Sequence, residues 1–483
     1  MSTILDLQPQ AVWRYFHQLT QIPRPSHHET AVQQYVLDEA ARLGLEAVRD
    51  EAGNIRVRKP ASSGHEQAAG VILQAHLDMV PQKNVDKVHD FVRDPITTKV
   101  RDDGWVTADG TTLGADNGIG AALILAVLAD ANLQHPPLEA LFTATEETGM
   151  LGALGLQPNW LNGRYLINLD YEDEGELCIG CAGGLDGSFS VPYATRTAQM
   201  PAYRLQVRGL RGGHSGVDIH RNRGNAIRIL AQALVAIGAT DIAELSGGNL
   251  RNAIPREAHA RIGLPDGMAA AEARRRLAAL VPQINGSLNA DDQGLALTLE
   301  ADGDVEQVID DSRRLLDVLR ALPDGVDRMS ATIDGLVETS TNLAAIRCED
   351  GALQISCLLR SSSEAQKADL ANRMESVLRL AGGQAVFDGD YGGWQPQPDS
   401  VLVNVFQRTG ELLFGHEPPV KAIHAGLECG ILSAHYQHWQ MISFGPTITG
   451  AHSPDEAVRI DTVGRCQQWL QMCLQELAAS GGR

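Results

Sequence analysis

The stretch that decides the fold is Gly70-Val71-Ile72-Leu73-Gln74-Ala75-His76-Leu77-Asp78. Its apolar, β-branched beginning, bounded by polar sequence, predicts a buried β-strand. His76 and Asp78 are two residues apart, so their side chains point to the same side of an extended backbone. An imidazole and a carboxylate at one strand end suit a metal site or an acid–base site, although such a pair also serves purely structural roles.

Length, composition and charge limit the class of protein. The 483 residues exceed one ordinary core, so we expect two domains or one domain with a large insertion. With 43% hydrophobic and 21% charged residues, the composition is ordinary for a globular α/β protein. The net charge of −20 makes nucleic acid and anionic membrane surfaces poor partners.

The lack of a visible signal peptide or membrane span and the number of cysteines predict a cytoplasmic protein. The N-terminal residues lack the basic and apolar regions of a signal peptide, and no apolar run approaches the ~20 residues of a membrane span. Seven cysteines, an odd number in so long a chain, favour reduced thiols. Cys178 and Cys181 form a CxxC motif without the second pair of a zinc knuckle, so we expect structural thiols, with a redox or metal role as the alternative.

Further carboxylates follow the apolar segments downstream. Asp116 precedes the apolar segment 119–128, which predicts a buried helix with either a plain aspartate N-cap or a functional group at its start. Glu146 and Glu147 follow the predicted strand 138–143, where a solvated helix start is the alternative, and Asp170 closes another apolar strand. Ligands collect at the carboxyl ends of strands in open α/β sheets, and so many facing acids would repel one another unless cations held them.

One more candidate lies far along the chain. A predicted strand at 441–445 and a Gly-Pro loop lead to His452. Ser453 as N-cap and Pro454 as the first helical residue predict a helix there. His452 would then lie just before a helix at the same crevice.

Between residues 189 and 395 the pattern changes. Strand, helix and strand are predicted at 203–207, 224–238 and 258–262. A comparable unit follows, with strands at 295–299 and 353–359 and helices at 305–321 and 364–380. No cluster of metal-type residues falls in this part of the sequence.

The ordered set of motifs resembles the co-catalytic zinc peptidases of the M20 class. Within that class it is most similar to the Xaa-His dipeptidases, also described as cytosolic non-specific dipeptidases. The resemblance covers essentially the whole chain, and every metal and catalytic position is present. The matching stretches are His76 to Asp78, Gly114-Ala115-Asp116-Asn117-Gly118, Glu146-Glu147, Asp170 and His452, with further matches at 22–26, 181–184, 212–216, 224–226 and 424–430.

The resemblance implies an α/β fold: a zinc-peptidase-type catalytic domain with a central sheet flanked by helices, and an inserted α+β lid domain. The catalytic domain would comprise residues 1–187 and 395–483, with the lid at 188–394. Monomer and homodimer are both compatible with the sequence.

The resemblance also implies the ligand set of a two-metal centre. Asp116 would bridge two ions ~3.5–4 Å apart. His76 and Asp170 would complete one ion, and Glu147 and His452 the other. Oxygen and nitrogen ligands suit Zn²⁺, with Mn²⁺ or Co²⁺ as alternatives.

Catalytic and substrate-binding roles follow from the same resemblance. Glu146, left without a metal, would take a proton from the attacking water and pass it to the leaving amine. Asp78 would fix the tautomer of His76, and His214 would stabilise the oxyanion. Two further side chains and one loop match positions that bind the C-terminal end of the substrate: Asn252, Arg360 and the loop at Gly426.

The expected activity is metal-dependent hydrolysis of dipeptides with a free C-terminal carboxylate, in particular Xaa-His dipeptides with broad tolerance of the first residue. The alternatives are an N-acyl amino-acid deacylase on the same scaffold and a non-catalytic binding protein. The stretch 424–430 and the large lid favour the dipeptidase, and the retention of Glu146 and every ligand argues against loss of catalysis.

Overall fold

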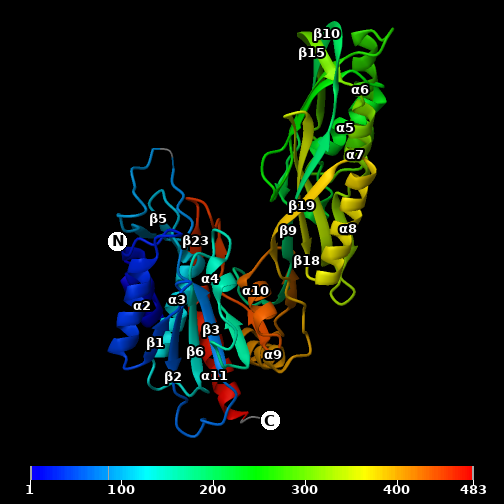
Figure 1. The fold of residues 1–483 in the computed structure, drawn as a ribbon. Helices are drawn as coiled ribbons and strands as arrows, with labels where there is room; N and C mark the ends of the chain where they lie inside the picture. The colour runs from blue at the N-terminus through cyan, green and yellow to red at the C-terminus, as the bar shows by residue number, and fades with distance from the viewer. Residues whose placement is uncertain (1–2, 85, 481–483) are drawn as a thin grey trace. The chain divides into compact units, whose positions relative to one another are not determined.

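The computed structural model describes residues 3–84 and 86–480, and these form two compact units (Figure 1). The first unit comprises the chain up to Gly180, Gln395–Ala422 and the chain from Leu427 onward. The second comprises Cys181–Trp394 and Ile423–Gly426. The second unit is therefore inserted into the sequence of the first.

The first unit is built on a mixed eight-stranded sheet with the order β1-β2-β6-β3-β7-β21-β8-β20. Its central strands β6, β3, β7 and β21 run parallel to one another. Every residue of β3 and β6 is buried, as expected for strands covered on both faces. The strands are β1 (Glu46–Arg49), β2 (Ile55–Lys59), β6 (Leu138–Thr143), β3 (Val71–His76), β7 (Tyr165–Asn168), β21 (Gln440–Ser443), β8 (Leu177–Cys181) and β20 (Val420–Ile423).

The register of the parallel strands brings their carboxyl ends together. His76 of β3 pairs with Thr143 of β6, and Gln74 of β3 pairs with Asn168 of β7. Glu146 and Asp170 follow their strands by three and two residues, so both begin loops at the edge that His76 reaches. The strand pairing thus gathers side chains that are up to 94 residues apart in the sequence.

Helices cover this sheet, and the first unit also contains a second, smaller sheet. Among them, α1 packs against α3, α3 packs against β3, and α9 packs against both α11 and β21. A separate four-stranded sheet has the order β22-β23-β5-β4. The helices are α1 (Gln10–Gln21), α2 (Thr30–Arg42), α3 (Ala115–Ala129), α4 (Leu151–Gly155), α9 (Val401–Phe414), α10 (Glu428–His435) and α11 (Ile460–Ala479), and the strands are β4 (Thr98–Val100), β5 (Trp105–Ala108), β22 (Ile448–Thr449) and β23 (Ala457–Arg459).

The second unit contains the same βαββαβ topology twice. Its first half is β10 (Thr195–Arg208), α5 (Ala226–Ala236), β12 (Ile242–Gly247), β14 (Ala258–Gly263), α6 (Ala270–Asn285) and β15 (Ala296–Ile309). Its second half is β9 (Gly183–Pro192), α7 (Ser312–Ala321), β17 (Val337–Glu349), β18 (Ala352–Ser361), α8 (Glu364–Leu380) and β19 (Gln384–Tyr391). The strands lie side by side in the order β15-β10-β14-β12 in the first half and β19-β9-β18-β17 in the second. In both halves this is the order fourth, first, third, second along the chain.

The two halves share one sheet and one core. The second strands of both halves, β12 and β17, pair antiparallel through Ser246 with Arg347 and Gly247 with Ile346. One cluster of buried apolar residues extends over α5, α6, α7 and α8 and the strands beneath them. The short strands β11 (Gly213–His214), β13 (Ala253–Ile254) and β16 (Gly325–Met329) complete the unit, with β11 paired to β13.

Two predicted helices differ from the structure. The expected helix at 305–321 begins only at Ser312, because β15 extends to Ile309 and pairs with β10. The expected helix at Pro454 is absent from the described residues: 453–456 form a turn, β23 follows, and α11 begins at Ile460.

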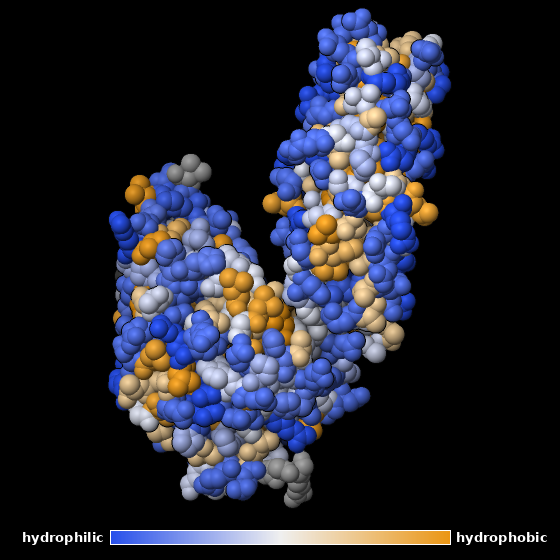
Figure 2. Space-filling view, in the orientation of Figure 1, coloured by the Kyte–Doolittle hydropathy of each residue, from blue (hydrophilic) through white to orange (hydrophobic). Residues whose placement is uncertain are grey.

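The remaining sequence-level expectations concern cysteines and membranes. Cys178 and Cys181 are buried in β8, and neither forms a disulfide within residues 3–84 and 86–480. Within the same residues, no helix has the length and apolar character needed to cross a bilayer. Figure 2 shows mostly hydrophilic side chains on the visible face of each unit, with scattered apolar ones.

Candidate metal centre and substrate-binding residues

Asp116 lies between two histidine–carboxylate pairs in the first unit. Its Oδ1 is 3.0 Å from His76 Nε2, which is itself 3.4 Å from Asp170 Oδ1. Its Oδ2 is 3.2 Å from His452 Nε2, which is 3.0 Å from Glu147 Oε2. One carboxylate therefore faces one imidazole with each oxygen, and each imidazole has a second carboxylate beside it.

These side chains fit a divalent cation. One nitrogen or oxygen atom from each of His76, Asp116 and Glu147 lies within 4.8 Å of the others, so the three form a metal-binding cluster. Glu147 Oε1 is buried and has no hydrogen-bond partner among the described residues. An unsatisfied buried carboxylate oxygen is costly, and a cation satisfies it.

Neighbouring charges shift the pKa values of both histidines upward. Hydrogen bonds to Asp116 and Glu147 raise the pKa of His452 to about 11. Burial would lower the pKa of His76, but Asp170, Asp116 and Asp78 hold it well above its usual value. Protons on these imidazoles and cations on the carboxylates are alternative means of balancing the same negative charge.

Asp78 organises the turn that carries the two glutamates. Its carboxylate accepts hydrogen bonds from the backbone N–H groups of Glu146 (2.9 Å) and Glu147 (3.1 Å) and from the Ser26 hydroxyl (2.8 Å). Burial opposes ionisation, yet the contacts with His76 and these donors lower the pKa of Asp78 to about 2. The Ser26 hydroxyl thus supports Asp78, and α2, which begins four residues later, has no side-chain cap.

Asp78 also faces His76. The Nδ1 atom of His76 lies 3.2 Å from the main-chain oxygen of Asp78 and 3.4 Å from its Oδ1. Both atoms are acceptors, so this surrounding favours a proton on Nδ1. The lone pair of Nε2 then points toward Asp116 and Asp170, which leaves it available to a metal.

Glu146 differs from its neighbour Glu147. Its side chain makes no hydrogen bond with the described residues, and burial, followed by the charges of Asp170, Glu428 and Glu147, raises its pKa well above the usual value. A carboxylate with raised proton affinity beside a metal cluster has the character of a general base.

In the second unit, the surroundings of His214 define its tautomer. Its Nδ1 accepts hydrogen bonds from the backbone N–H groups of Gly216 (3.2 Å) and Val217 (3.1 Å). Burial and the charge of Arg360 lower the pKa of His214 to about 4, although Asp218 opposes this shift. The ring is therefore neutral at pH 7 and carries its proton on Nε2, which can donate a hydrogen bond.

Arg360 is held in a network that includes other predicted substrate-binding residues. It is 5% exposed, and its Nη1 donates to the Tyr391 hydroxyl at 3.1 Å. Its Nε lies 3.4 Å from Ser215 Oγ, and the backbone N–H of Ser215 donates to the Asn252 carbonyl at 2.8 Å. A Cβ on Gly426 would lie 3.3 Å from the Tyr391 ring. Within the second unit, these contacts connect Asn252, Arg360 and Gly426 through Ser215 and Tyr391.

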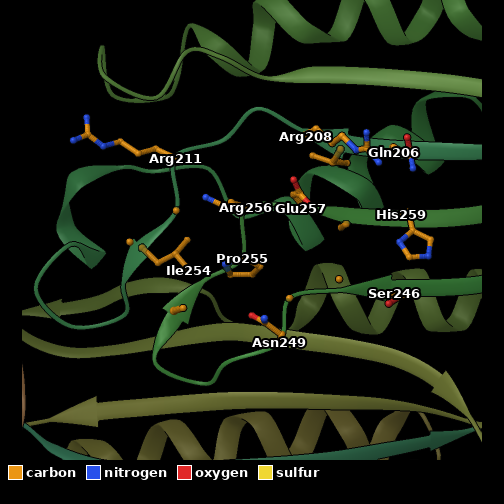
Figure 3. Close-up of a pocket in the computed structure, with 17 residues that line it drawn as sticks. Gln206, Arg208, Arg211, Ser246, Asn249, Ile254, Pro255, Arg256, Glu257 and His259 are labelled. Carbon is orange, nitrogen blue, oxygen red and sulfur yellow. The ribbon is translucent and has the colours of Figure 1, made fainter. Parts of the chain in front are cut away.

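A separate hollow of about 600 Å³ flanks the two-stranded sheet of β11 and β13, which carries His214 (Figure 3). It is lined by Gly213, Ala253 and Ile254 of that sheet, and by Arg208, Gln206 and His259 on the nearby strands β10 and β14. Apart from its position beside His214, it contains none of the predicted site residues, so its size alone does not mark it as the reaction site.

Sequence reasoning missed several residues that support the first unit's site. Glu428 is fully buried and accepts hydrogen bonds from Gln74 (2.6 Å) and Thr143 (2.7 Å) of the two central strands. Asn117 donates to Asp170 at 2.5 Å. Both lie inside stretches that carry the family resemblance, 424–430 and 114–118, which was the available signal.

A carboxylate shared by two histidine–carboxylate pairs, with an additional glutamate at the same sheet edge, defines a metal-dependent hydrolase of the α/β class. The chain belongs to peptidase family M20/M25/M40, whose family model matches residues 72–476. This agrees with the class that the sequence motifs resemble.

Individual relatives are similar over the whole chain. A cytosol non-specific dipeptidase from Escherichia coli (strain K12) is 43% identical over 490 aligned positions, which cover 99% of this chain and 100% of the relative. The crystal structure of aminoacylhistidine dipeptidase from Vibrio alginolyticus matches with a TM-score of 0.89 and 42% identity, covering 98% of both chains. A tripeptidase from Staphylococcus aureus shares the fold, with a TM-score of 0.57, 15% identity and coverage of 98% of this chain and 99% of its own.

Proposed function

We propose that this protein hydrolyses dipeptides that have a free C-terminal carboxylate, Xaa-His dipeptides among them, at a centre of two divalent metal ions. The observation that carries the proposal is Asp116, whose two carboxylate oxygens face His76 and His452 separately. Whole-length similarity to two dipeptidases supports the substrate class. Zn²⁺ suits the nitrogen and oxygen ligands, and Mn²⁺ and Co²⁺ are the alternatives to test.

The proposed ligand sets follow the contacts around Asp116. Asp116 would be shared by the two ions, His76 and Asp170 would hold the first, and Glu147 and His452 would hold the second. When bound, the ions supply Lewis-acid polarisation of the scissile carbonyl and a nucleophilic water at neutral pH.

The side chains of the protein transfer the protons and stabilise the charges that develop. Glu146 takes a proton from the attacking water and delivers it to the leaving amine, a role that suits its raised pKa. Asp78 keeps Glu146 and Glu147 in place through their backbone N–H groups and orients His76. His214 donates a hydrogen bond from its Nε2–H group to the developing oxyanion and keeps its own proton.

The second unit is proposed to act as a lid that recognises the C-terminal end of the substrate. Arg360 presents Nη2, which makes no hydrogen bond with the described residues, while Nη1 is fixed by Tyr391. A planar guanidinium oriented in this way binds a carboxylate with two parallel donors. Asn252 and the backbone at Gly426 complete this grip, so the site measures substrate length from the carboxylate.

The cellular setting is part of the proposal. The name of the Escherichia coli relative places that protein in the cytosol, and we propose a cytoplasmic location here too. The net charge of −20 makes nucleic acid and anionic membrane surfaces poor partners, so we propose neither as a partner.

A substrate panel tests the proposal. Ala-His, β-Ala-His and Ala-Leu are compared with C-terminally amidated Ala-His, a tripeptide and N-acetyl amino acids, before and after exhaustive chelation and with Zn²⁺, Mn²⁺ or Co²⁺ restored. We expect cleavage of the free dipeptides only, lost with the metal and restored by it. Equal cleavage of the amide or the tripeptide contradicts the specificity, preferred cleavage of N-acetyl amino acids indicates a deacylase, and full activity of metal-free protein contradicts the metal centre.

A further inference from the structure

We propose that Glu456 and Arg24 form a clamp that holds the Asp116 loop in the conformation that binds metal, and so sets the metal affinity of the site. Neither residue is a ligand in the proposed centre. Both are positioning residues, and the inference rests on the metal centre of the proposed function.

Glu456 binds the backbone of the loop that precedes α3. Its Oε2 accepts hydrogen bonds from the N–H groups of Leu113 (2.7 Å) and Gly114 (3.0 Å), and its Oε1 accepts from Ala115 (2.7 Å) and Asp116 (3.1 Å). Four consecutive amides thus converge on one carboxylate that is 2% exposed. Buried N–H donors need acceptors, and the two oxygens of this carboxylate supply them to all four amides.

Arg24 binds the carbonyl side of the same region. Its Nη1 donates to the carbonyls of Leu77 (2.7 Å) and Asp78 (2.9 Å), and its Nη2 donates to that of Gly114 (2.5 Å). Like Glu456, it is only 2% exposed. The guanidinium therefore ties the end of the His76 segment to the start of the Asp116 loop.

The two glycines of the loop make room for this guanidinium. A Cβ on either Gly114 or Gly118 would lie 2.6 Å from Arg24 Nη2, closer than real contacts allow. Gly114 also has φ +70°, a left-handed conformation that favours glycine. The glycines of the Gly-Ala-Asp-Asn-Gly stretch are thereby explained by the clamp.

The clamp also joins segments that carry ligands from distant parts of the chain. Glu456 follows His452 by four residues, and its own N–H bonds to the Ser453 carbonyl at 3.1 Å. Anchoring Glu456 on the 113–116 amides therefore fixes the turn of His452 beside Asp116. The two residues also interact electrostatically. The negative charges of Glu456, Asp78, Asp116 and Glu147 all favour the charged form of the buried Arg24 guanidinium.

An isosteric substitution tests the clamp. In Glu456→Gln, one oxygen becomes an NH₂ group that cannot accept the amides it faces, while the side-chain volume is retained. Asp455→Asn is the matched control, because Asp455 is adjacent and exposed and loses the same charge. Arg24→Lys keeps the positive charge but cannot donate to three carbonyls in the same planar geometry.

The readout is Zn²⁺ affinity, measured by competition with a chromophoric chelator on folded protein, with metal stoichiometry at saturation. We expect Glu456→Gln and Arg24→Lys to weaken binding by about 10–100-fold, as removal of supporting groups around a metal typically does. Asp455→Asn should remain within about twofold of wild type. At saturating Zn²⁺ the turnover of both clamp variants should largely recover.

The outcomes separate this inference from the proposed function. Wild-type affinity in Glu456→Gln or in Arg24→Lys overturns the clamp and leaves the metal centre intact. A wild-type protein that binds no divalent metal overturns the metal centre itself. If Glu456→Gln does not fold, Glu456→Asp, which keeps the charge but cannot span all four amides, is measured instead, and unchanged affinity in that variant also overturns the clamp.

Discussion

Replacing His214 tests whether a neutral imidazole is the oxyanion donor. The pKa of about 4 leaves roughly one ring in a thousand protonated at pH 7, and the two N–H groups bound at Nδ1 leave the donor proton on Nε2. Removal of one preorganised donor costs about 10²–10³-fold in kcat, or about 2.7–4 kcal/mol of transition-state stabilisation. His214→Ala should lose that much, and His214→Gln, which retains an amide donor, should lose less.

The same substitution should have a small effect on the fold. It removes an acceptor for two backbone N–H groups, worth about 0.5–1.5 kcal/mol each, and Val217 is 54% exposed, so water replaces its bond. The lowered pKa means that the unfolded chain binds the His214 proton more readily between pH 6.5 and 4. The stability linked to this group is therefore complete above pH 6.5 and is lost as the pH falls toward 4, and His214→Ala should lose less stability over that range.

The assay measures kcat and KM for Ala-His between pH 5 and 8, together with metal content and urea unfolding. The donor role requires a low kcat, unchanged metal content and a wild-type profile without an ionisation from His214. A kcat within tenfold of wild type in His214→Ala would refute the reasoning. So would an ionisation near pH 6.5 that disappears in the variant, because His214 would then titrate as an ordinary histidine.

Three further predictions follow from the geometry. Glu146→Gln should reduce kcat by about 10²–10⁴-fold or more with both metals bound, because the amide cannot accept a proton. Glu147→Gln should instead lose metal. Elemental analysis of the two variants distinguishes these outcomes, and metal loss in Glu146→Gln would mean that the two roles are reversed. Arg360→Ala and C-terminal amidation of Ala-His should each severely lower kcat/KM while their combination adds little, since both remove one contact; additive losses in this double cycle contradict the assignment. Gly120→Ala should destabilise the fold by about 1–3 kcal/mol and weaken metal binding, because its Cβ would lie 2.0 Å from Asn117 Oδ1 and 2.5 Å from the Leu169 carbonyl oxygen. Gly464→Ala on α11 is the control, since the nearest atom to its Cβ would be 3.6 Å away. In urea unfolding, this control should be neutral or stabilising.

Much of the first unit could be predicted from local pattern. The run before His76 and the segments before Glu146 and Asp170 are short and apolar, and they form β3, β6 and β7. A buried parallel strand needs such a run whatever surrounds it, so local sequence is sufficient. Four of the candidate ligands, His76, Asp116, Glu147 and Asp170, could be recognised for the same reason, because each ends or follows an apolar strand or precedes an apolar helix. The fifth, His452, was placed at the crevice through a helix start at Ser453 and Pro454 that the structure does not form.

The errors occurred where distant contacts outweigh local preference. Val305, Val308 and Ile309 have helical spacing, yet they lie in β15, because its backbone pairs with β10 and the two valines pack against Ala198 and Ala202 of that strand. Ser453 and Pro454 are typical of a helix start. Instead, Glu456 is held by the amides of 113–116, and β23 pairs with β5 immediately afterwards.

The sequence by itself determined the family, the candidate ligands and the central strands, because these depend on residue types within short segments. Only the tertiary structure decided which oxygen of Asp116 faces which histidine, that His214 is neutral with its proton on Nε2, and that Arg24 and Glu456 hold the Asp116 loop. These features depend on hydrogen bonds between groups up to 343 residues apart. Buried donors and acceptors must find partners wherever the fold places them, so only the folded chain identifies the partner.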